Sequence, residues 1–266
     1  MKLLTDDFKT YSRRKLLKRL LIFIIFLSLT IWSAINTKFY IINVISNLNE
    51  VYRFLFKEML VVNFSVILNI TKYTVETIII SYVATMFSIL ISFIFALLSA
   101  STTSPFPFFM TISRAIAAIL RTVPDVVWVI ILVPAYGIGS MTGTIALFLT
   151  STGFLVKSFS EVLESIDLEK LNAIRACGAS WLQIIGRGVM PQFFPGLISW
   201  SFFGFDTNVR SSFIIGMVGG GGLGFLLQFG LKLYRFEIVT MTIILMALLF
   251  MFLDYVSNFI RRRVLK

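Results

Sequence analysis

Five polar residues close together interrupt an apolar stretch in the last third of the chain. Asp206, Asn208 and Arg210 alternate with other residues, and Ser211 and Ser212 follow directly. Asp206 and Arg210 are four residues apart, so they share one face of a helix and can neutralise each other. A guanidinium group also matches an oxyanion in charge and geometry. Because charges among membrane helices are costly, the group predicts either a structural ion pair between helices or a contact with a charged solute.

The composition is that of an integral membrane protein. Of 266 residues, 58% are hydrophobic and 14% are charged, whereas soluble domains average roughly half apolar and a quarter charged. At about 20 residues per spanning helix, the chain has room for about six transmembrane helices. The formal charge of +11 comes from basic residues beside hydrophobic segments. It therefore indicates anchoring on the cytoplasmic face and contact with anionic lipid, and we expect no nucleic-acid partner.

The residue inventory argues against enzyme chemistry. The sequence has no histidine and one cysteine, Cys177, which excludes Ser-His-Asp triads, Cys-His dyads, His/Cys metal sites and an internal disulfide. The glycine run that starts at Gly219 is followed by Phe225 and Leu226, whereas a P-loop needs Gly-Lys-Ser/Thr. We therefore expect no catalytic residue, no metal and no ATP or other cofactor bound by this chain. The glycines are instead expected to form a flexible, close-packed turn beside a pore.

The hydrophobic pattern predicts an all-α membrane protein with both termini in the cytoplasm. A basic segment at 1–19 precedes the first span and its external segment, 20–72, and a transmembrane core at 73–260 is followed by a basic tail at 261–266. An interfacial amphipathic helix is expected around 51–67. The expected spans are 20–35, 74–101, 108–136, 144–161, 192–218 and 236–260. The segment at 225–235 is expected to be an external re-entrant or loop segment.

The third span contains a break. Pro124, within Arg121–Asp125, removes a backbone donor and should kink or interrupt the helix. Lipid tolerates such a break only where protein or water satisfies the freed carbonyl. We therefore expect the break to face protein.

A hydrophilic segment at 162–191 separates the fourth and fifth spans. Its order predicts a short helix, a break at Gly178, a second short helix, and Pro191 in the first turn of the next span. The second short helix is expected to carry three apolar side chains on one face, Trp181, Ile184 and Ile185.

This segment resembles the EAA loop of ABC-importer permeases. That loop reads Glu-Ala-Ala, three residues, Gly, nine residues, Ile, one residue, Leu, Pro, and here Ala173 lies five residues before Gly178 and Pro191 thirteen after it. The departures are Asn172 for Glu, Ile174 for the second Ala, Gly188 for Ile and Met190 for Leu. The alternative is a cytoplasmic loop with ordinary helix breakers.

Three further segments resemble the phosphonate/phosphite permeases among these transporters. Residues 206–212 and 214–224 are similar to the family's Glu-x-Asn-Val-Arg-Ala-Ser and Leu-Gly-x-Val-Gly-Ala-Gly-Gly-Ile-Gly, and residues 121–128 to its Arg-Ser/Thr-Ile-Pro-x-Leu-Val-Trp. The resemblance covers about 115–224. The departures here are Asp206 for Glu, Ser211 for Ala and Gly221 for Ala.

The resemblance implies the type I ABC importer permease fold, in a multi-pass subunit of the bacterial plasma (inner) membrane. Two such subunits, identical or paralogous, would enclose the path. A solute-binding protein outside would deliver the ligand, and two cytoplasmic ATPases would bind ATP and Mg. The helix after Gly178 would dock on the ATPase through Trp181, Leu182 and Ile185, with Arg175 or Arg187 at the rim. The implied coupling residues are Ala173, Gly178, Ala179, Ser180, Trp181, Leu182, Ile185 and Pro191.

The resemblance also implies inward transport of phosphonate, phosphite or a related phosphorus oxyanion. Arg210 would then contact the anion, Asp206 would orient Arg210, and Asn208, Ser211 and Ser212 would be neutral partners. The expected gate or hinge residues are Pro124, Gly219, Gly220, Gly221 and Gly222. Three alternatives remain: a permease for another small solute such as an amino acid, a passive channel, and a lipid-phosphate enzyme with a polar site formed by Asp125, Asp206 and Arg210.

Overall fold

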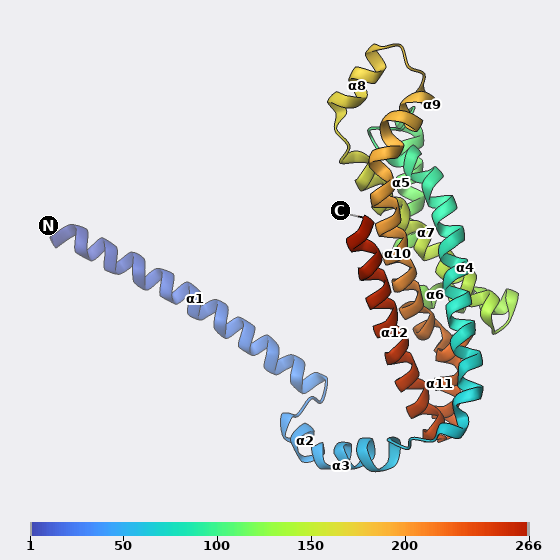
Figure 1. Cartoon of the computed structure of the whole chain (residues 1–266). Helices are drawn as coiled ribbons and strands as arrows, with labels where there is room; N and C mark the ends of the chain where they lie inside the picture. The colour runs from blue at the N-terminus through green and yellow to red at the C-terminus, as the bar shows by residue number, and fades with distance from the viewer. Residues whose placement is uncertain (1, 265–266) are drawn as a thin grey trace. The chain divides into compact units, whose positions relative to one another are not determined.

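The structure is a computed structural model that describes the backbone of residues 2–264 and the side chains of residues 15–40, 42–260 and 262–263. Several side chains of the expected basic segment at 1–19, and part of the basic tail at 261–266, lie outside the described residues. The chain divides into two compact units, Met1–Glu58 and Met59–Lys266 (Figure 1).

The first unit is one long helix followed by short ones. In order, these are α1 (Lys2–Asn36), α2 (Ile41–Ser46), α3 (Leu48–Arg53) and η1 (Phe54–Met59), a π-helical turn that continues α3. Residues Lys15–Asn36 of α1 are long and apolar enough to cross a membrane. Their large apolar side chains are exposed, as lipid contact requires, and they cover the first expected span.

The prediction of a continuous interfacial helix at 51–67 is wrong. The helical segment ends at Met59, and residues 60–63 have no helical backbone. Asn63 is extended, and its side chain accepts a hydrogen bond from the backbone N–H of Ser65 at 3.0 Å. An asparagine that bonds locally in this way competes with helix continuation and starts a new turn. That turn is η2 (Phe64–Val66).

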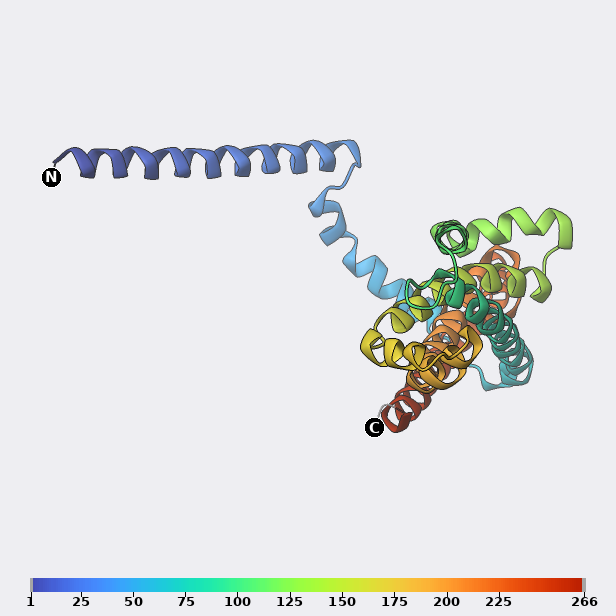
Figure 2. The same cartoon turned by 90° about the horizontal axis from the view of Figure 1, so that it is seen from above.

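The second unit is a bundle of helices, which Figures 1 and 2 show as long elements running alongside one another. After η2, its elements are α4 (Ile67–Ser99), α5 (Pro107–Thr122), α6 (Asp125–Tyr136), α7 (Ser140–Glu164), α8 (Leu168–Ala176), α9 (Trp181–Gln183), η3 (Ile184–Val189), α10 (Met190–Ile215), η4 (Gly216–Gly220), α11 (Gly222–Lys232) and α12 (Phe236–Val264). All regular elements in the described part of the chain are helical. The expected all-α fold is confirmed.

Among the residues that the structure describes, length and composition give four helices that can each cross a membrane, or up to six when two bent pairs each count as one span. α5 and α6 form the first pair and are bent by 87°. The second pair joins Trp181–Gly220 to α11 with a bend of 53°. The segment expected at 225–235 as a re-entrant or loop segment lies mostly in α11, which follows that bend and ends at Lys232.

α4 begins earlier than the span expected from Thr74. The helix starts at Ile67, and the hydroxyls of Thr71 and Thr74 donate to backbone carbonyls four residues back, at 2.9 and 3.0 Å. Because these bonds satisfy the hydroxyls within the helix, its polar first turns do not end it.

α7 lies against α4 and α5. Ser88 of α4 donates to the carbonyl of Phe148, and Ser92 donates to that of Thr152, both at 3.0 Å. Such small polar residues let membrane helices approach closely and bond across the contact. The packing continues toward α10 through a core that includes Leu155, Phe159 and Phe193.

Two glycines of α7 allow backbone contacts that a side chain would block. An added Cβ at Gly143 would lie 2.2 Å from the carbonyl oxygen of Gly220, and one at Gly153 would lie 2.7 Å from both the Ala117 oxygen and the Arg121 nitrogen. Gly153 therefore sets how closely α7 approaches the last turn of α5.

We expect Gly153→Ala to push α5 away from α7 and to lower stability by about 1–3 kcal/mol, the usual cost of overpacking. Thermal unfolding of the purified subunit in detergent measures this. Gly186→Ala is the matched control, because a Cβ there meets nothing within 4 Å. Equal unfolding temperatures for the two variants would contradict the close approach.

Candidate functional site

Arg210 is held between two carboxylates. Its Nη2 lies 3.2 Å from Oδ2 of Asp206, one turn earlier on α10, and 2.5 Å from Oδ1 of Asp254 on α12. The ring centroid of Phe250 lies 5.6 Å from the guanidinium carbon. The side chain of Arg210 is 46% exposed and that of Asp254 is 51% exposed. This geometry is an ion-pair network between two helices.

Asp254 was missed by the sequence reasoning. It is the only charged residue of α12 between Glu237 in the first turn and Arg261, which is the signal that could have found it, because a lone charge in a spanning helix requires a partner. Its pairing with Arg210 could not be predicted, because the two residues are far apart in the sequence.

Asn208 belongs to a different contact. Its Oδ1 accepts from the Ser151 hydroxyl at 2.5 Å, and its Nδ2 donates to Thr85 Oγ1 at 2.8 Å. It is only 3% exposed. Two residues along an α-helix turn the side chain by about 200°, so Asn208 faces α4 and α7 while Asp206 and Arg210 face α12.

A polar pocket of about 260 Å³ lies beside Asn208, and we call it the Asn208 pocket. It is bounded by the break between α5 and α6, by α7 and by α10. Its lining residues are Arg121, Asp125, Thr150, Ser151, Phe154, Gly204, Thr207, Asn208 and Ser211. Neither Asp206 nor Arg210 lines it, and Ser212 is buried with its hydroxyl donating to the Val209 carbonyl at 2.7 Å.

The five predicted path residues therefore do not form one cluster. Asn208 and Ser211 line the Asn208 pocket. Asp206 pairs with Arg210, which also pairs with Asp254 of α12, and Ser212 bonds to its own helix. Asp125 lines the pocket without Asp206 or Arg210, so the three residues of the lipid-phosphate enzyme alternative are not brought together either.

Arg121 is the cation of the Asn208 pocket. It lies at the end of α5, and Asp125 begins α6 beyond the break at Pro124. Among the described residues Arg121 has no carboxylate within ion-pair distance, and its side chain is exposed. Its guanidinium donors are free to bind an acceptor that enters the pocket.

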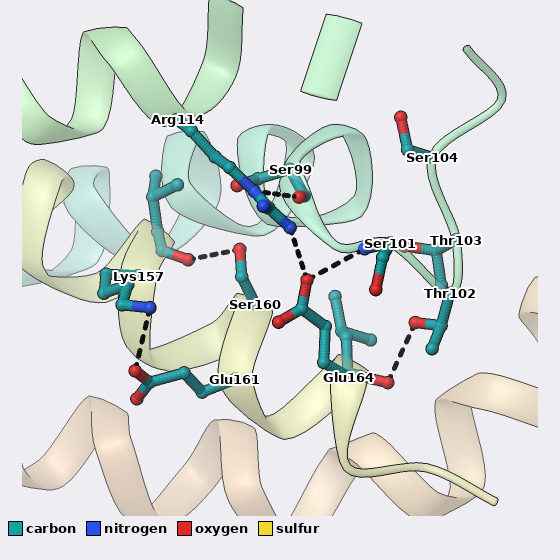
Figure 3. Close-up of polar contacts among 12 residues, drawn as sticks. Ser99, Ser101, Thr102, Thr103, Ser104, Arg114, Lys157, Ser160, Glu161 and Glu164 are labelled. Carbon is teal, nitrogen blue, oxygen red and sulfur yellow. Dashed lines mark hydrogen bonds and ion pairs between the residues drawn. The ribbon is translucent and has the colours of Figure 1, made fainter. Parts of the chain in front are cut away.

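A second pocket of about 260 Å³ also includes Arg121, and we call it the Lys157 pocket. Its lining residues are Ser99, Arg114, Ala117, Ala118, Arg121, Val156, Lys157, Ser160 and Glu164. Figure 3 shows two ion pairs here, Arg114 with Glu164 at 2.5 Å and Lys157 with Glu161 at 3.0 Å. Glu164 also accepts from the backbone N–H of Ser101 at 2.9 Å.

The hydrophilic segment folds as expected, with Gly178 at a φ of 77° between α8 and α9. Gln183 accepts from the Ser180 backbone N–H at 2.8 Å and caps α9. The indole N–H of Trp181 donates to the Thr103 carbonyl at 2.9 Å. This bond attaches α9 to the turn between α4 and α5.

The apolar face of this segment requires a correction. Ile185 is 8% exposed and packs with Ile184 in the core, so it is not available to an outside partner. Leu182 is 73% exposed and points away from that core. The π-helical turn of η3 begins at Ile184, which shifts the register from the one assumed for a regular helix. Of the other implied coupling residues, Ala173, Gly178, Ser180 and Pro191 are exposed and Ala179 is half-buried.

The expected hinge residues lie at bends. Pro124 separates α5 from α6. Gly219, Gly221 and Gly222 have φ values of 115°, 80° and 68°, which other residues rarely adopt, and Gly220 contacts Gly143. A gating role for these residues stays a prediction.

Comparison with solved structures identifies the fold. A chain of the MetNI methionine ABC transporter, in an inward-facing conformation, matches with a TM-score of 0.69 at 22% identity, over 76% of this chain and 99% of that one. A bacterial alginate ABC transporter, solved with its pentasaccharide-bound periplasmic protein, matches with a TM-score of 0.61 at 12% identity, over 90% and 94%. The fold is that of a type I ABC importer permease.

Sequence comparison then gives the family. Residues 88–266 match the binding-protein-dependent transport system inner membrane component. This chain belongs to that family and is a multi-pass membrane protein. It is a transport permease subunit.

Three relatives have names that specify a cargo. The phosphate-import permease protein PhnE of Mycolicibacterium smegmatis is 34% identical to this chain. The match covers 71% of this chain and 36% of that protein. The phosphite permease PtxC of Stutzerimonas stutzeri is 31% identical over 71% of this chain and 68% of its own length. A putative cryptic phosphonate permease, PhnE2 of Escherichia coli K12, is 39% identical over 44% of this chain and 97% of its own.

We expect Arg210→Gln to reduce the amount of folded subunit several-fold, because it leaves Asp206 and Asp254 without their cation. Arg210→Gln/Asp254→Asn should recover part of the loss, since it removes one of the two stranded charges. The monodisperse fraction after detergent extraction measures this. Arg235→Gln is the control, because it breaks only an exposed pair with Glu237. If the double variant gives no more folded subunit than Arg210→Gln alone, the pairing of Arg210 with Asp254 does not stabilise the subunit.

Proposed function

We propose that this permease subunit carries a phosphorus oxyanion (phosphonate, phosphite or phosphate) inward. The observation that carries the proposal is Arg121 in the Asn208 pocket, a cation without a carboxylate partner among the described residues. A guanidinium fork binds two oxygens of a tetrahedral oxyanion at once. The relatives named for phosphate, phosphite and phosphonate support the same class of cargo.

The remaining lining suits a small polar anion in transit. Hydroxyl groups of Thr207 and Ser211 line the pocket and can donate to oxyanion oxygens. Asp125 lines it too, so the charged lining consists of one cation and one carboxylate. A site that transports must release its ligand, so a carboxylate that prevents a tight trap is compatible with passage.

An amino acid is the second candidate cargo. Arg121 and Asp125 line the same pocket, and together they could bind the carboxylate and the ammonium group of a zwitterion. A probable D-methionine permease of Vibrio cholerae is 27% identical over 58% of this chain. Uptake measurements separate the two cargoes directly.

The partners follow from the proposed function. Two cytoplasmic ATPase subunits would supply ATP hydrolysis with Mg, an external or periplasmic solute-binding protein would deliver the ligand, and a second permease subunit, identical or paralogous, would complete the path. In this arrangement α8 and α9 face the ATPase. Leu182 would be the apolar contact, with Arg175 and Arg187 beside it, and both termini would be cytoplasmic.

The test of the cargo is uptake by the complete transporter in cells that lack their own phosphorus oxyanion importers. We expect uptake of phosphite, methylphosphonate or phosphate, and we expect Arg121→Gln to reduce it about tenfold or more, as loss of a charge-assisted hydrogen bond predicts. Arg235→Gln, outside both pockets, should transport normally. Uptake of amino acids alone, or full uptake of oxyanions by Arg121→Gln, would contradict the proposal.

The ATPase contact has its own test. Leu182→Asp should abolish copurification of the ATPase, because it introduces a charge into an apolar contact, while the subunit itself stays folded since Leu182 is exposed. Leu233→Asp, at an exposed leucine after α11, should leave copurification intact. If the ATPase still copurifies with Leu182→Asp, Leu182 is not part of the interface.

A further inference from the structure

The Lys157 pocket holds more positive than negative charge. Three cations line it, Arg114, Arg121 and Lys157, against one carboxylate, Glu164, which gives a net charge of +2 (3 − 1). Glu161, the partner of Lys157, is not a lining residue. The side chains of all three cations are exposed, so their charge is open to an anion that enters the pocket.

The donors in this pocket also outnumber the acceptors. Arg114 uses two of its donor groups, one toward Glu164 and one toward the Ser99 carbonyl at 2.9 Å, and a guanidinium has five N–H donors. Lys157 has a single carboxylate contact. Arg121 has none among the described residues. Several donors therefore remain for a ligand with more than one oxygen.

The existing ion pairs do not account for the pocket. Glu164 is already shared between Arg114 and the backbone N–H of Ser101. The Lys157–Glu161 pair has both side chains more than half exposed, and exposed pairs of this spacing are weak. Lys157 can therefore exchange Glu161 for an anion in the pocket at little cost.

Arg121 connects the two pockets. It lines the Asn208 pocket on one side and the Lys157 pocket on the other. The Lys157 pocket lies toward the end of the bundle that carries α8 and α9, since Glu164 ends α7 next to the turn that Trp181 contacts. An anion leaving the Asn208 pocket in that direction stays within reach of the same guanidinium.

We propose that the Lys157 pocket is a second binding site for a free phosphate-type oxyanion, formed by Arg114, Arg121 and Lys157. The inference rests on the proposed function for the direction of transfer, from the Asn208 pocket toward the coupling segment. Binding itself depends only on the charge and the donors of the pocket, so it is testable without transport.

Charge-selective labelling of a cysteine in the pocket tests the site. Ala118 is exposed and lines the pocket, whereas Ala115 is an exposed alanine of α5 that does not. Each is changed to Cys in a Cys177→Ser background, because Cys177 is itself exposed. The complete transporter, in nanodiscs of zwitterionic lipid, is then treated with an anionic or a cationic methanethiosulfonate. Rates are normalised to a free thiol.

We expect the ratio of the anionic to the cationic labelling rate to be about tenfold higher for Ala118→Cys than for Ala115→Cys. This is the scale on which clefts lined by charges of one sign concentrate counter-ions. Inorganic phosphate should slow labelling at Ala118→Cys and leave Ala115→Cys unchanged. Adding Lys157→Gln should lower the preference several-fold, whereas adding Lys232→Gln, outside the pocket, should not.

Two results would overturn the proposal. One is equal charge preference at the two cysteines with no response to phosphate. The other is protection by phosphatidylglycerol in the nanodisc without protection by phosphate, which assigns the pocket to a lipid headgroup. Because labelling needs no uptake, phosphate protection in a transporter that imports no phosphorus oxyanion would refute the proposed cargo and leave this site standing.

Discussion

Charged side chains among membrane-spanning helices need a counter-charge, and this requirement organises the polar part of the bundle. Arg210 satisfies it within the protein, through Asp206 on its own helix and Asp254 on α12. Arg121 does not satisfy it among the described residues, and two pockets meet at its side chain. The contrast separates a cation that joins helices from one that is available to a solute.

α7 is the element through which the two pockets and the coupling segment are positioned. It contributes Ser151 to the Asn208 pocket and Lys157 to the Lys157 pocket, and it ends at Glu164. The close contact at Gly153 fixes the last turn of α5 against it. A displacement of α9 reaches the turn after α4 through Trp181 and Thr103, and Glu164 links that turn to α5. Such a chain of contacts transmits motion only between discrete packings.

Local features of this structure could be predicted from the sequence. Pro124 lacks a backbone donor and fixes its φ, so the break after α5 follows from one residue type, and Gly178 similarly identifies the bend between α8 and α9. The 87° bend could not be predicted, because its angle depends on what α6 packs against.

Features that depend on helix rotation or on distant partners were not predictable. The pairing of Arg210 with Asp254 joins residues 44 apart in sequence. A single sequence does not reveal that these two residues lie close together in the fold. Ile185 was expected on an exposed face, but the π-helical turn of η3 rotates it into the core. Arg121 was recognised as part of a motif, and its place between two pockets required the packing of α5, α7 and α10.

The bond between Trp181 and Thr103 has a consequence for how the turn after α4 tolerates evolutionary change. The acceptor is a main-chain carbonyl, which every amino acid carries. Substitution at this position therefore leaves that bond's acceptor in place, whereas inserting or deleting one residue in the turn would move the carbonyl away from the indole. Among homologous sequences, the length of this turn should consequently vary less than its composition.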